Sequence, residues 1–169
     1  MPEAEGGQAD APALIDAGVF IGALLVEDPR HTEARPLVEQ ARQGVLRACT
    51  IAGILSEVYG ALTWEQAEPP HNPAEAAEVV RLLVEPPSAI AVLDERLDAI
   101  LLALALAATH ELRARRIHDA RHAAVALSRG VTSVYTYDID DWKHFHADGL
   151  RIVGPPTTLA RMAQIASRS

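Results

Sequence analysis

Four acidic residues of this sequence lie at the edges of apolar segments, where an isolated charge is unfavourable. They are Asp16, Glu57, Asp119 and Asp138. An unpaired carboxylate in such surroundings costs several kcal/mol, so each of these side chains is expected to have a partner. A divalent cation can pair with several carboxylates at once, and Mg²⁺ and Mn²⁺ both bind oxygen ligands. The pattern therefore predicts a metal site and favours a metal-dependent nuclease.

Each of the four acids also has a purely structural explanation when it is taken alone. Asp119, in the first turn of a predicted helix, can interact with the helix dipole. Asp16, directly after a predicted strand, can form an Asx-turn or a helix cap, and Asp138 belongs to an acidic loop of a kind that is usually solvated. Glu57 is harder to explain because the surrounding sequence Ser-Glu-Val-Tyr-Gly-Ala-Leu offers no obvious local partner. The set of four, rather than any single residue, favours the metal site.

The composition indicates one globular domain without a broad nucleic-acid-binding surface. The sequence has 169 residues, of which 49% are hydrophobic and 22% charged, as in an ordinary folded domain. Its net charge of −8 argues against an extended basic face, so any RNA contact must be local, metal-assisted or helped by a partner. The single cysteine, Cys49, excludes an intrachain disulfide and is expected to be buried and inert.

Neither a secretory signal nor a membrane-spanning segment is visible. Residues 1–12 are acidic, small and polar, and we expect them to form a disordered arm. The most apolar run, Ala99–Ala108, has ten residues, which is too short to span a bilayer and favours a buried core helix. We therefore expect a cytoplasmic protein that has no membrane partner.

Short strand-like runs alternate with helical ones along the sequence. Strands are predicted at Ala13–Ile15, Val45–Cys49, Ala89–Leu93, Ser133–Tyr137 and Leu150–Val153. Helices are predicted at Gly18–Val26, Thr32–Gln43, Asp119–Arg129 and Thr157–Ser167, with three more after Thr50, Asn72 and Asp94. This alternation predicts an α/β fold with a mainly parallel sheet. We expect one domain over residues 13–155 and a helical C-terminal tail over residues 156–169.

Several helix ends carry recognisable signals. The segment Asn72–Glu75 reads Asn-Pro-Ala-Glu, with a capping residue, a proline at the first helical position and an acid at the third. Thr50 and Asp94 are predicted to cap the helices that follow them. Gly44 and Gly130 are predicted to end helices, because glycine adopts the left-handed conformation that helix termini require.

The predicted fold allows the four acids to meet. Functional groups of parallel sheets collect beyond the carboxyl ends of the strands. Asp16 and Asp138 each end a predicted strand, whereas Glu57 and Asp119 lie on predicted helices. A cation held among them can polarise a phosphate, lower the pKa of a bound water and stabilise a leaving oxygen.

Four segments that contain these acids resemble the PIN-domain family, and most closely the VapC-type ribonuclease toxins of bacterial toxin–antitoxin pairs. The segments read LIDAGVFIGALL, SEVYGAL, HDARHAAVALSRG and VYTYDIDDWKHF, in the family's order and approximate spacing. The resemblance covers the chain from Ala13 to about Pro155. The last two segments are the most specific, with an Asp, an Ala-rich helix, a Gly and a strand that ends in Thr-x-Asp-x-x-Asp-aromatic.

The resemblance implies a three-layer α/β/α fold with a mainly parallel central sheet and one or two Mg²⁺ or Mn²⁺ ions. It implies in-line hydrolysis of RNA by a metal-activated water, which leaves a 3′-hydroxyl and a 5′-phosphate. The implied ligands are Asp16, Glu57, Asp119 and Asp138, with Asp141 as an accessory ligand. Thr136 matches a family hydroxyl that orients a carboxylate or a water. A VapB-like antitoxin and a second copy of the chain are the implied protein partners.

Two departures from the family pattern bear on activity. Ala17 and Gly18 follow the first acid, where family members usually carry a hydroxyl residue and then a small polar one. Groups that orient metal ligands are often worth ten- to a hundredfold in affinity or activity, so a weak or altered site is one expectation. The alternative function is accordingly a catalytically weak or inactive PIN-like module that binds metal, RNA or protein. Trp142 stands where Phe is commoner, which we interpret as a packing change.

The sequence His118-Asp119-Ala120-Arg121-His122 resembles the zinc-protease motif H-E-x-x-H, with Asp in place of Glu. Its two histidines would face the same way on a helix. No third ligand is evident downstream, so zinc hydrolysis is the less favoured alternative. We expect His118 and His122 to be partly exposed side chains, or side chains that face RNA near the metal site.

The densest basic cluster lies just before and around the third acid. It consists of Arg113, Arg115, Arg116 and Arg121. These side chains can contact phosphates that flank the scissile bond, receive an acidic antitoxin segment, or simply belong to a charged loop between two helices.

Two apolar helix faces are candidates for the homodimer contact. They are Leu37/Val38/Ala41 and Val79/Val80/Leu83. Packing into the protomer's own core is the alternative for each.

Overall fold

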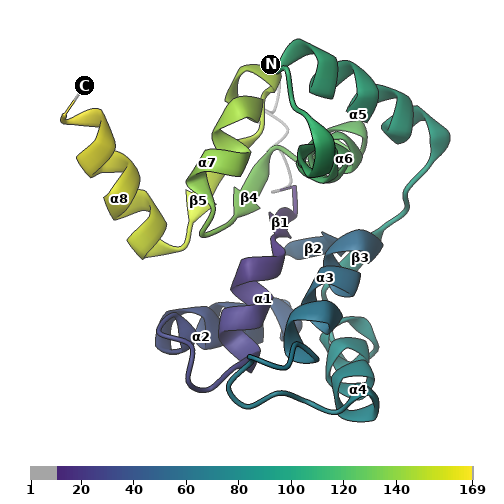
Figure 1. The fold of residues 1–169 in the computed structure, drawn as a ribbon, viewed down its shortest axis with the longest axis vertical. Coiled ribbons are helices and arrows are strands. Elements are labelled where there is room, and N and C mark those ends of the chain that lie inside the picture. The colour runs from purple at the N-terminus through teal and green to yellow at the C-terminus, as the bar shows by residue number, and fades with distance from the viewer. Residues whose placement is uncertain (1–10, 169) are drawn as a thin grey trace, which may run out of the picture.

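The central sheet of the computed structural model is parallel throughout and lies between helices (Figure 1). The structure describes residues 11–168, and the predicted arm at residues 1–12 falls almost wholly outside them. The strands of this part are β1 (Ala13–Ile15), β2 (Ala48–Ile51), β3 (Ala91–Leu93), β4 (Ser133–Tyr135) and β5 (Arg151–Gly154). Their order across the sheet is β3-β2-β1-β4-β5. The predicted α/β class and three-layer α/β/α arrangement are confirmed.

Register places the carboxyl ends of β1 and β4 side by side. Leu14 of β1 is aligned with Cys49 of β2 on one side and with Val134 of β4 on the other. Ile15 is aligned with Tyr135, and the Asp16 N–H donates to the Tyr135 carbonyl at 3.0 Å. The two chain segments that leave these strands therefore begin next to each other, in the middle of the sheet.

Helices pack on both faces of the sheet. The α-helices of the described part are α1 (Ala17–Leu24), α2 (His31–Arg42), α3 (Ala52–Leu62), α4 (Pro73–Val84), α5 (Leu97–Thr109), α6 (Ile117–Ser128), α7 (Ile139–Trp142) and α8 (Pro156–Ala166). Two 3-10 helices, η1 (Ala114–Arg116) and η2 (Lys143–Asp148), precede α6 and follow α7. Figure 1 shows α1 to α4 in the lower half of the view, α5 to α7 in the upper half, and α8 extending to one side.

The core is built from aliphatic strand residues and small helix residues. Leu14 and Ile15 of β1 and Val134 of β4 are fully buried. Burying one such side chain contributes about 1.5–3 kcal/mol. Cys49 of β2 is also fully buried, and burial raises the pKa of its thiol to about 12, so this thiol is inert in the folded protein.

The predicted start of α4 and two predicted helix ends are confirmed. The Asn72 side chain accepts from the Glu75 N–H at 2.9 Å, and the Glu75 side chain accepts from the Asn72 N–H at 3.3 Å, which completes a capping box. Gly44 and Gly130 follow α2 and α6 with φ values of +75° and +73°.

Two predicted caps and one predicted strand start are wrong. Thr50 lies inside β2, where its buried hydroxyl donates to the Ile15 carbonyl at 3.3 Å, and α3 begins two residues later. Asp94 precedes α5 by three residues, and Arg96 occupies the cap position. The strand predicted from Val45 begins at Ala48, because the N–H groups of residues 45 and 46 bond to the end of α2 instead of to β1.

The two helix faces proposed for a homodimer belong to the protomer's own core. Val38, Ala41 and Leu83 are buried, and the other three residues of those faces pack against the core. The homodimer itself stays a prediction.

Only one side of α5, which was predicted to be a buried core helix, is buried. Leu101 and Leu104 on its other side are 57% and 56% exposed. No helix within residues 11–168 is long and apolar enough to cross a membrane.

Candidate active site

Asp16 is the most firmly held of the candidate residues. It ends β1 and caps α1, where its Oδ1 accepts from the Ala17 N–H at 2.8 Å. Its Oδ2 accepts from the Thr136 hydroxyl at 2.7 Å and from the Trp142 indole N–H at 3.0 Å. Burial raises the pKa of Asp16, and these hydrogen bonds oppose the rise because they stabilise the carboxylate. Donors from α1, from α7 and from the segment after β4 thus fix the orientation of one carboxylate.

Trp142 is more than the packing change that the sequence suggested. Its side chain is only 3% exposed, and its indole N–H points to Asp16. An indole nitrogen is a donor only, and a buried one needs an acceptor. That requirement was the available signal, although the sequence did not show that the acceptor would be Asp16, 126 residues away. Trp142 and Thr136 supply donors that Ala17 and Gly18 lack.

Thr136 links the ends of β1 and β4. Its hydroxyl donates to Asp16 and accepts from the Asp138 N–H at 2.9 Å. Asp138 itself caps α7 through its Oδ1, which accepts from the Asp141 N–H at 3.1 Å. One short segment therefore places two further carboxylates beside Asp16.

Asp119 approaches this group from the first turn of α6. Desolvation, followed by the charge of Asp141, raises the pKa of Asp119 to about 7, whereas His122 and Arg116 act in the opposite direction. The pKa of Asp141 is also raised, by burial first and then by Asp138. Carboxylates that raise one another's pKa form a group that a divalent cation would stabilise.

Glu57 reaches the pocket from α3 and pairs with a histidine. Its carboxylate lies 2.6 Å from His122 Nε2, and its side chain is 46% exposed. His122 on α6 is buried, which corrects the expectation of a partly exposed residue, while His118 is exposed as expected. The His122 ring fits closely against α3, since a Cβ added at Gly53 would lie 2.9 Å from its Cε1. This contact directs His122 toward Glu57.

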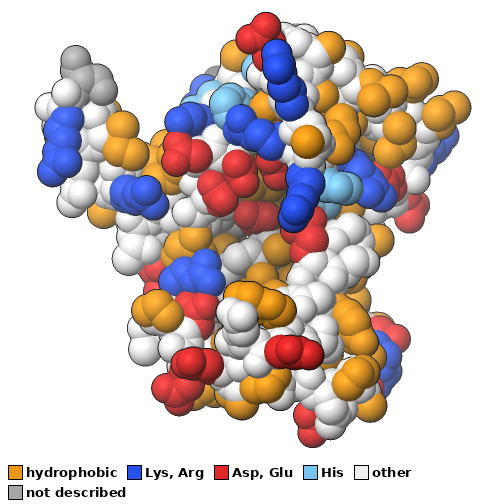
Figure 2. All heavy atoms as spheres, in the orientation of Figure 1, with side chains coloured by type: hydrophobic (Ala, Val, Ile, Leu, Met, Phe, Trp, Pro, Cys, Tyr) orange, Lys and Arg blue, Asp and Glu red, His pale blue; other side chains and the backbone are white. Residues whose placement is uncertain are grey.

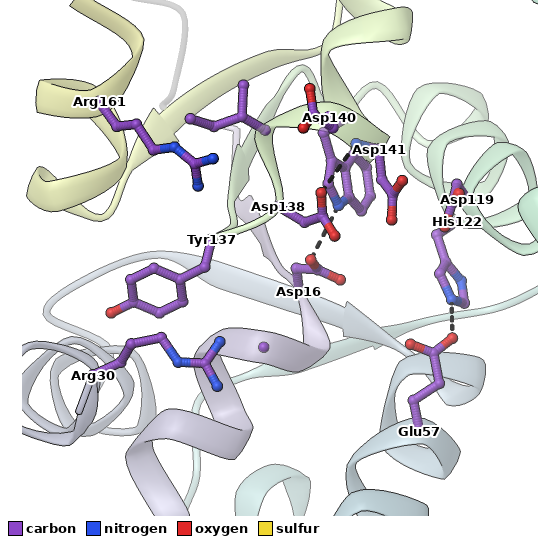
Figure 3. A pocket seen from close by; sticks show the side chains of 13 residues that line it. Asp16, Arg30, Glu57, Asp119, His122, Tyr137, Asp138, Asp140, Asp141 and Arg161 are labelled. Carbon is purple, nitrogen blue, oxygen red and sulfur yellow. Dashed lines mark hydrogen bonds and ion pairs between the residues drawn. The ribbon is translucent and has the colours of Figure 1, made fainter. Parts of the chain in front are cut away.

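One pocket of about 380 Å³ brings all four predicted acids together with Asp141 (Figure 3). Asp140, His122 and Trp142 line the same pocket. In the space-filling view, acidic side chains gather in a hollow near the centre of this face and basic side chains border them (Figure 2).

The donor chemistry of the pocket fits a hard divalent cation, because the candidate ligands are carboxylate oxygens. Within residues 11–168, however, no three Asp, Glu, His or Cys side chains already form a complete metal-binding group. Glu57, which is bonded to His122, would have to move to join the others. The same observation leaves the zinc alternative without a third ligand in the part of the chain that the structure describes.

The predicted basic cluster lies outside this pocket. Arg121 makes a bidentate ion pair with Glu95, and Arg116 donates to His144 at 2.7 Å and lies 3.9 Å from Asp141. Arg113 and Arg115 are exposed on and beside η1. Two other arginines, Arg30 and Arg161, line the pocket instead, and the sequence reasoning missed both.

The sequence matches the model of the PIN domain over residues 13–147. The chain belongs to the PIN domain family. The solved structures that resemble this PIN domain include the Mycobacterium tuberculosis protein VapC20, described as a toxin that cleaves the sarcin-ricin loop. The two chains are 21% identical, and the match covers 85% of this chain and 99% of VapC20 with a TM-score of 0.64. At this identity the likeness establishes a shared fold. No curated protein matches the sequence.

Proposed function

We propose that this PIN domain is a metal-dependent endoribonuclease and the toxin of a VapBC-type toxin–antitoxin pair. The observation that carries the proposal is the convergence of Asp16, Asp119, Asp138 and Asp141 in one pocket, where the pKa of Asp119 rises to about 7. The likeness to VapC20 supports the choice of RNA as substrate. A toxin of this kind would act in the cytoplasm and be held inactive by an antitoxin partner.

The acidic residues would bind the metal, and two neighbouring residues would position one of them. Asp16, Asp119 and Asp138 would hold one or two Mg²⁺ or Mn²⁺ ions, with Asp141 and Glu57 completing the ligand set. When bound, such an ion polarises the phosphodiester and lowers the pKa of the attacking water. Thr136 and Trp142 hold Asp16 in a fixed orientation. Water adds to phosphorus, the bond to the 3′-oxygen breaks, and the products are a 3′-hydroxyl and a 5′-phosphate.

Cleavage of a labelled structured RNA in EDTA, Mg²⁺ or Mn²⁺ tests the nuclease proposal. We expect metal-dependent cleavage that Asp119→Asn abolishes, because the substitution removes a charge and preserves the volume. Asp98→Asn is the matched control, since Asp98 is an exposed aspartate on α5 outside the pocket. Equal loss in both variants, or cleavage that persists in EDTA, would reject the acidic pocket as the active site. An ion that raises the melting temperature without any cleavage would indicate the binding-only alternative.

Induced expression in a bacterial host tests the toxin role separately. We expect growth arrest by the wild-type protein and normal growth with Asp119→Asn at equal protein levels. Metal-dependent cleavage in vitro without arrest would keep the nuclease and reject the toxin. Light scattering of the purified protein tests the predicted homodimer.

A further inference from the structure

The wall of the acidic pocket nearest α8 is built from two arginines and a tyrosine. Arg30, Tyr137 and Arg161 line the acidic pocket and also a second pocket of about 330 Å³, together with Thr157 and Thr158. The two pockets therefore share these three residues. In Figure 3, Arg30 and Arg161 lie on opposite sides of the Tyr137 ring, on the side of the acids away from Glu57.

Arg30 is held in place with one nitrogen left over. Its Nε and Nη2 donate to the two oxygens of Asp28 at 2.9 and 2.7 Å, and its guanidinium lies 5.1 Å from the centre of the Tyr137 ring. A Cβ added at Gly18, on the pocket wall, would lie 3.4 Å from Arg30 Nη1. Nη1 is thus the nitrogen without a bond to Asp28, and it lies beside the pocket. A guanidinium fixed by a carboxylate and an aromatic ring loses little freedom when it binds a phosphate.

Glu33 fixes the rest of this wall. One of its oxygens accepts from the Tyr137 hydroxyl at 2.9 Å and from the Thr157 hydroxyl at 2.7 Å, and the other accepts from the Thr157 N–H at 2.9 Å. Thr158 adds a bond from its hydroxyl to the Thr136 carbonyl at 2.8 Å. These bonds tie the start of α8 to the end of β4, so Arg161, one turn further along α8, is presented to the pocket.

Arg161 has its full hydrogen-bonding capacity available. Across residues 11–168 its side chain forms no hydrogen bond or ion pair, although its charge helps to lower the pKa of Asp140 after the larger effect of Lys143. Arg116 and Arg121 on the opposite side are both paired. The two arginines that line the acidic pocket are Arg30 and Arg161, and the Arg161 side chain has donors available for a phosphate. An RNA strand approaching a protein of net charge −8 needs such donors near the scissile bond.

We propose that Arg30, Tyr137 and Arg161 form a subsite for an RNA backbone phosphate next to the scissile one. The inference rests on the proposed nuclease function. It adds the path of the RNA strand, which would cross the pocket wall nearest α8 rather than run along η1 and α6. Guanidinium groups bind phosphate oxygens through two parallel N–H bonds, and the Tyr137 ring supplies the kind of surface on which nucleic-acid bases stack.

Arg161→Gln tests the subsite with Arg168→Gln as its control. Arg168 is exposed just beyond the end of α8 and lines neither pocket. The probe is a labelled RNA hairpin with a single-stranded loop, and its affinity is measured by fluorescence anisotropy in EDTA over a series of KCl concentrations. We expect Arg161→Gln to weaken binding about three- to tenfold and to reduce the slope of log K against log salt by roughly 0.7, the value for one single-strand phosphate contact. Arg30→Gln should act in the same direction.

The outcomes separate the subsite from the nuclease. If wild type binds RNA and Arg161→Gln matches Arg168→Gln in affinity and slope, the subsite is wrong. If an oligoglutamate peptide loses affinity for Arg161→Gln while RNA does not, the wall belongs to an acidic protein segment and the subsite is again wrong. If Arg161→Gln shows the expected loss but wild type never cleaves RNA with Mg²⁺ or Mn²⁺, the subsite stands and the nuclease fails. Equal melting temperatures of both variants confirm that folding is not the cause.

Discussion

Asp16 and Glu57 line the same pocket but are held in very different ways. Asp16 sits at the centre of the sheet and accepts hydrogen bonds from Ala17, Thr136 and Trp142. Glu57 is nearly half exposed on α3 and contacts one buried partner, His122. The Asp16 carboxylate is therefore already oriented in the metal-free protein, whereas the Glu57 carboxylate is bonded to His122. When a cation binds, we expect Glu57 to move further than Asp16, because fewer hydrogen bonds hold it.

The largest expected difference is between Asp16→Asn and Glu57→Gln. We expect Asp16→Asn to lower RNA cleavage about a hundred- to a thousandfold, a loss typical of a preorganised group that stabilises charge. Glu57→Gln should lower cleavage by a smaller factor, about tenfold, because this side chain is not preorganised for the ligand set. Single-turnover cleavage rates in Mn²⁺ provide the comparison. Equal losses would contradict this difference between Asp16 and Glu57.

Trp142→Phe tests the orientation of Asp16 alone. The substitution keeps an aromatic ring and removes the indole N–H that donates to Asp16, so we expect about a tenfold loss in Mn²⁺ affinity and cleavage. Trp64→Phe, at a residue that is 59% exposed in a loop, makes the same chemical change away from the site and should have no effect. Calorimetric titration with Mn²⁺ measures the affinity. Unchanged affinity in Trp142→Phe would return this residue to the packing role first assigned to it.

Much of the fold was readable from the sequence because its signals are local. The capping box at Asn72 and the glycine ends at Gly44 and Gly130 depend only on neighbouring residues and were predicted correctly. Thr50 failed as a cap because its hydroxyl bonds to Ile15, which is 35 residues away. A long-range hydrogen bond of this kind overrides a local capping preference.

The acidic residues of the candidate site could be predicted from the sequence, but the ion pairs of its arginines could not. The four acids lie in one pocket, and their order along strand ends and helix turns indicated as much. The pairing of Arg121 with Glu95, 26 residues away, could not be seen in the sequence. Arg161 was missed for a related reason, since its distance from the acids depends on how Glu33 holds the start of α8.

The raised pKa of Asp119 predicts how the stability of the metal-free protein depends on pH. The pKa rises from 3.8 to about 7 on folding, so between these values the folded state binds more protons than the unfolded state. Stability should therefore fall as pH rises from about 4 to 7 and then level off. The expected change is about 1–2 kcal/mol, after allowance for the exposed part of this half-buried group. Urea denaturation in EDTA measures it, and Asp119→Asn should flatten the profile; an equally steep profile in the variant would exclude Asp119 as the cause.

The smallest expected effect is that of Gly53→Ala on the α3 side. The new Cβ would press against His122, so the ring must shift and weaken its bond to Glu57. Removing a helical glycine gains up to about 1 kcal/mol, which offsets part of this strain. We expect a few-fold change in Mn²⁺ affinity with a nearly unchanged melting temperature. Gly60→Ala, in the same helix with nothing near its Cβ, should raise the melting temperature and leave Mn²⁺ affinity unchanged.

Because Cys49 is buried, we expect the native protein not to react with thiol reagents. Its thiol is the only one in the sequence, and in β2 it is both inaccessible and protonated at neutral pH. Ellman's reagent should therefore react only after denaturation. A cysteine introduced on the surface, for example by Arg168→Cys, would then be the single reactive thiol of the folded protein. A dye attached there could follow an RNA strand arriving at α8 without any need to remove the native cysteine.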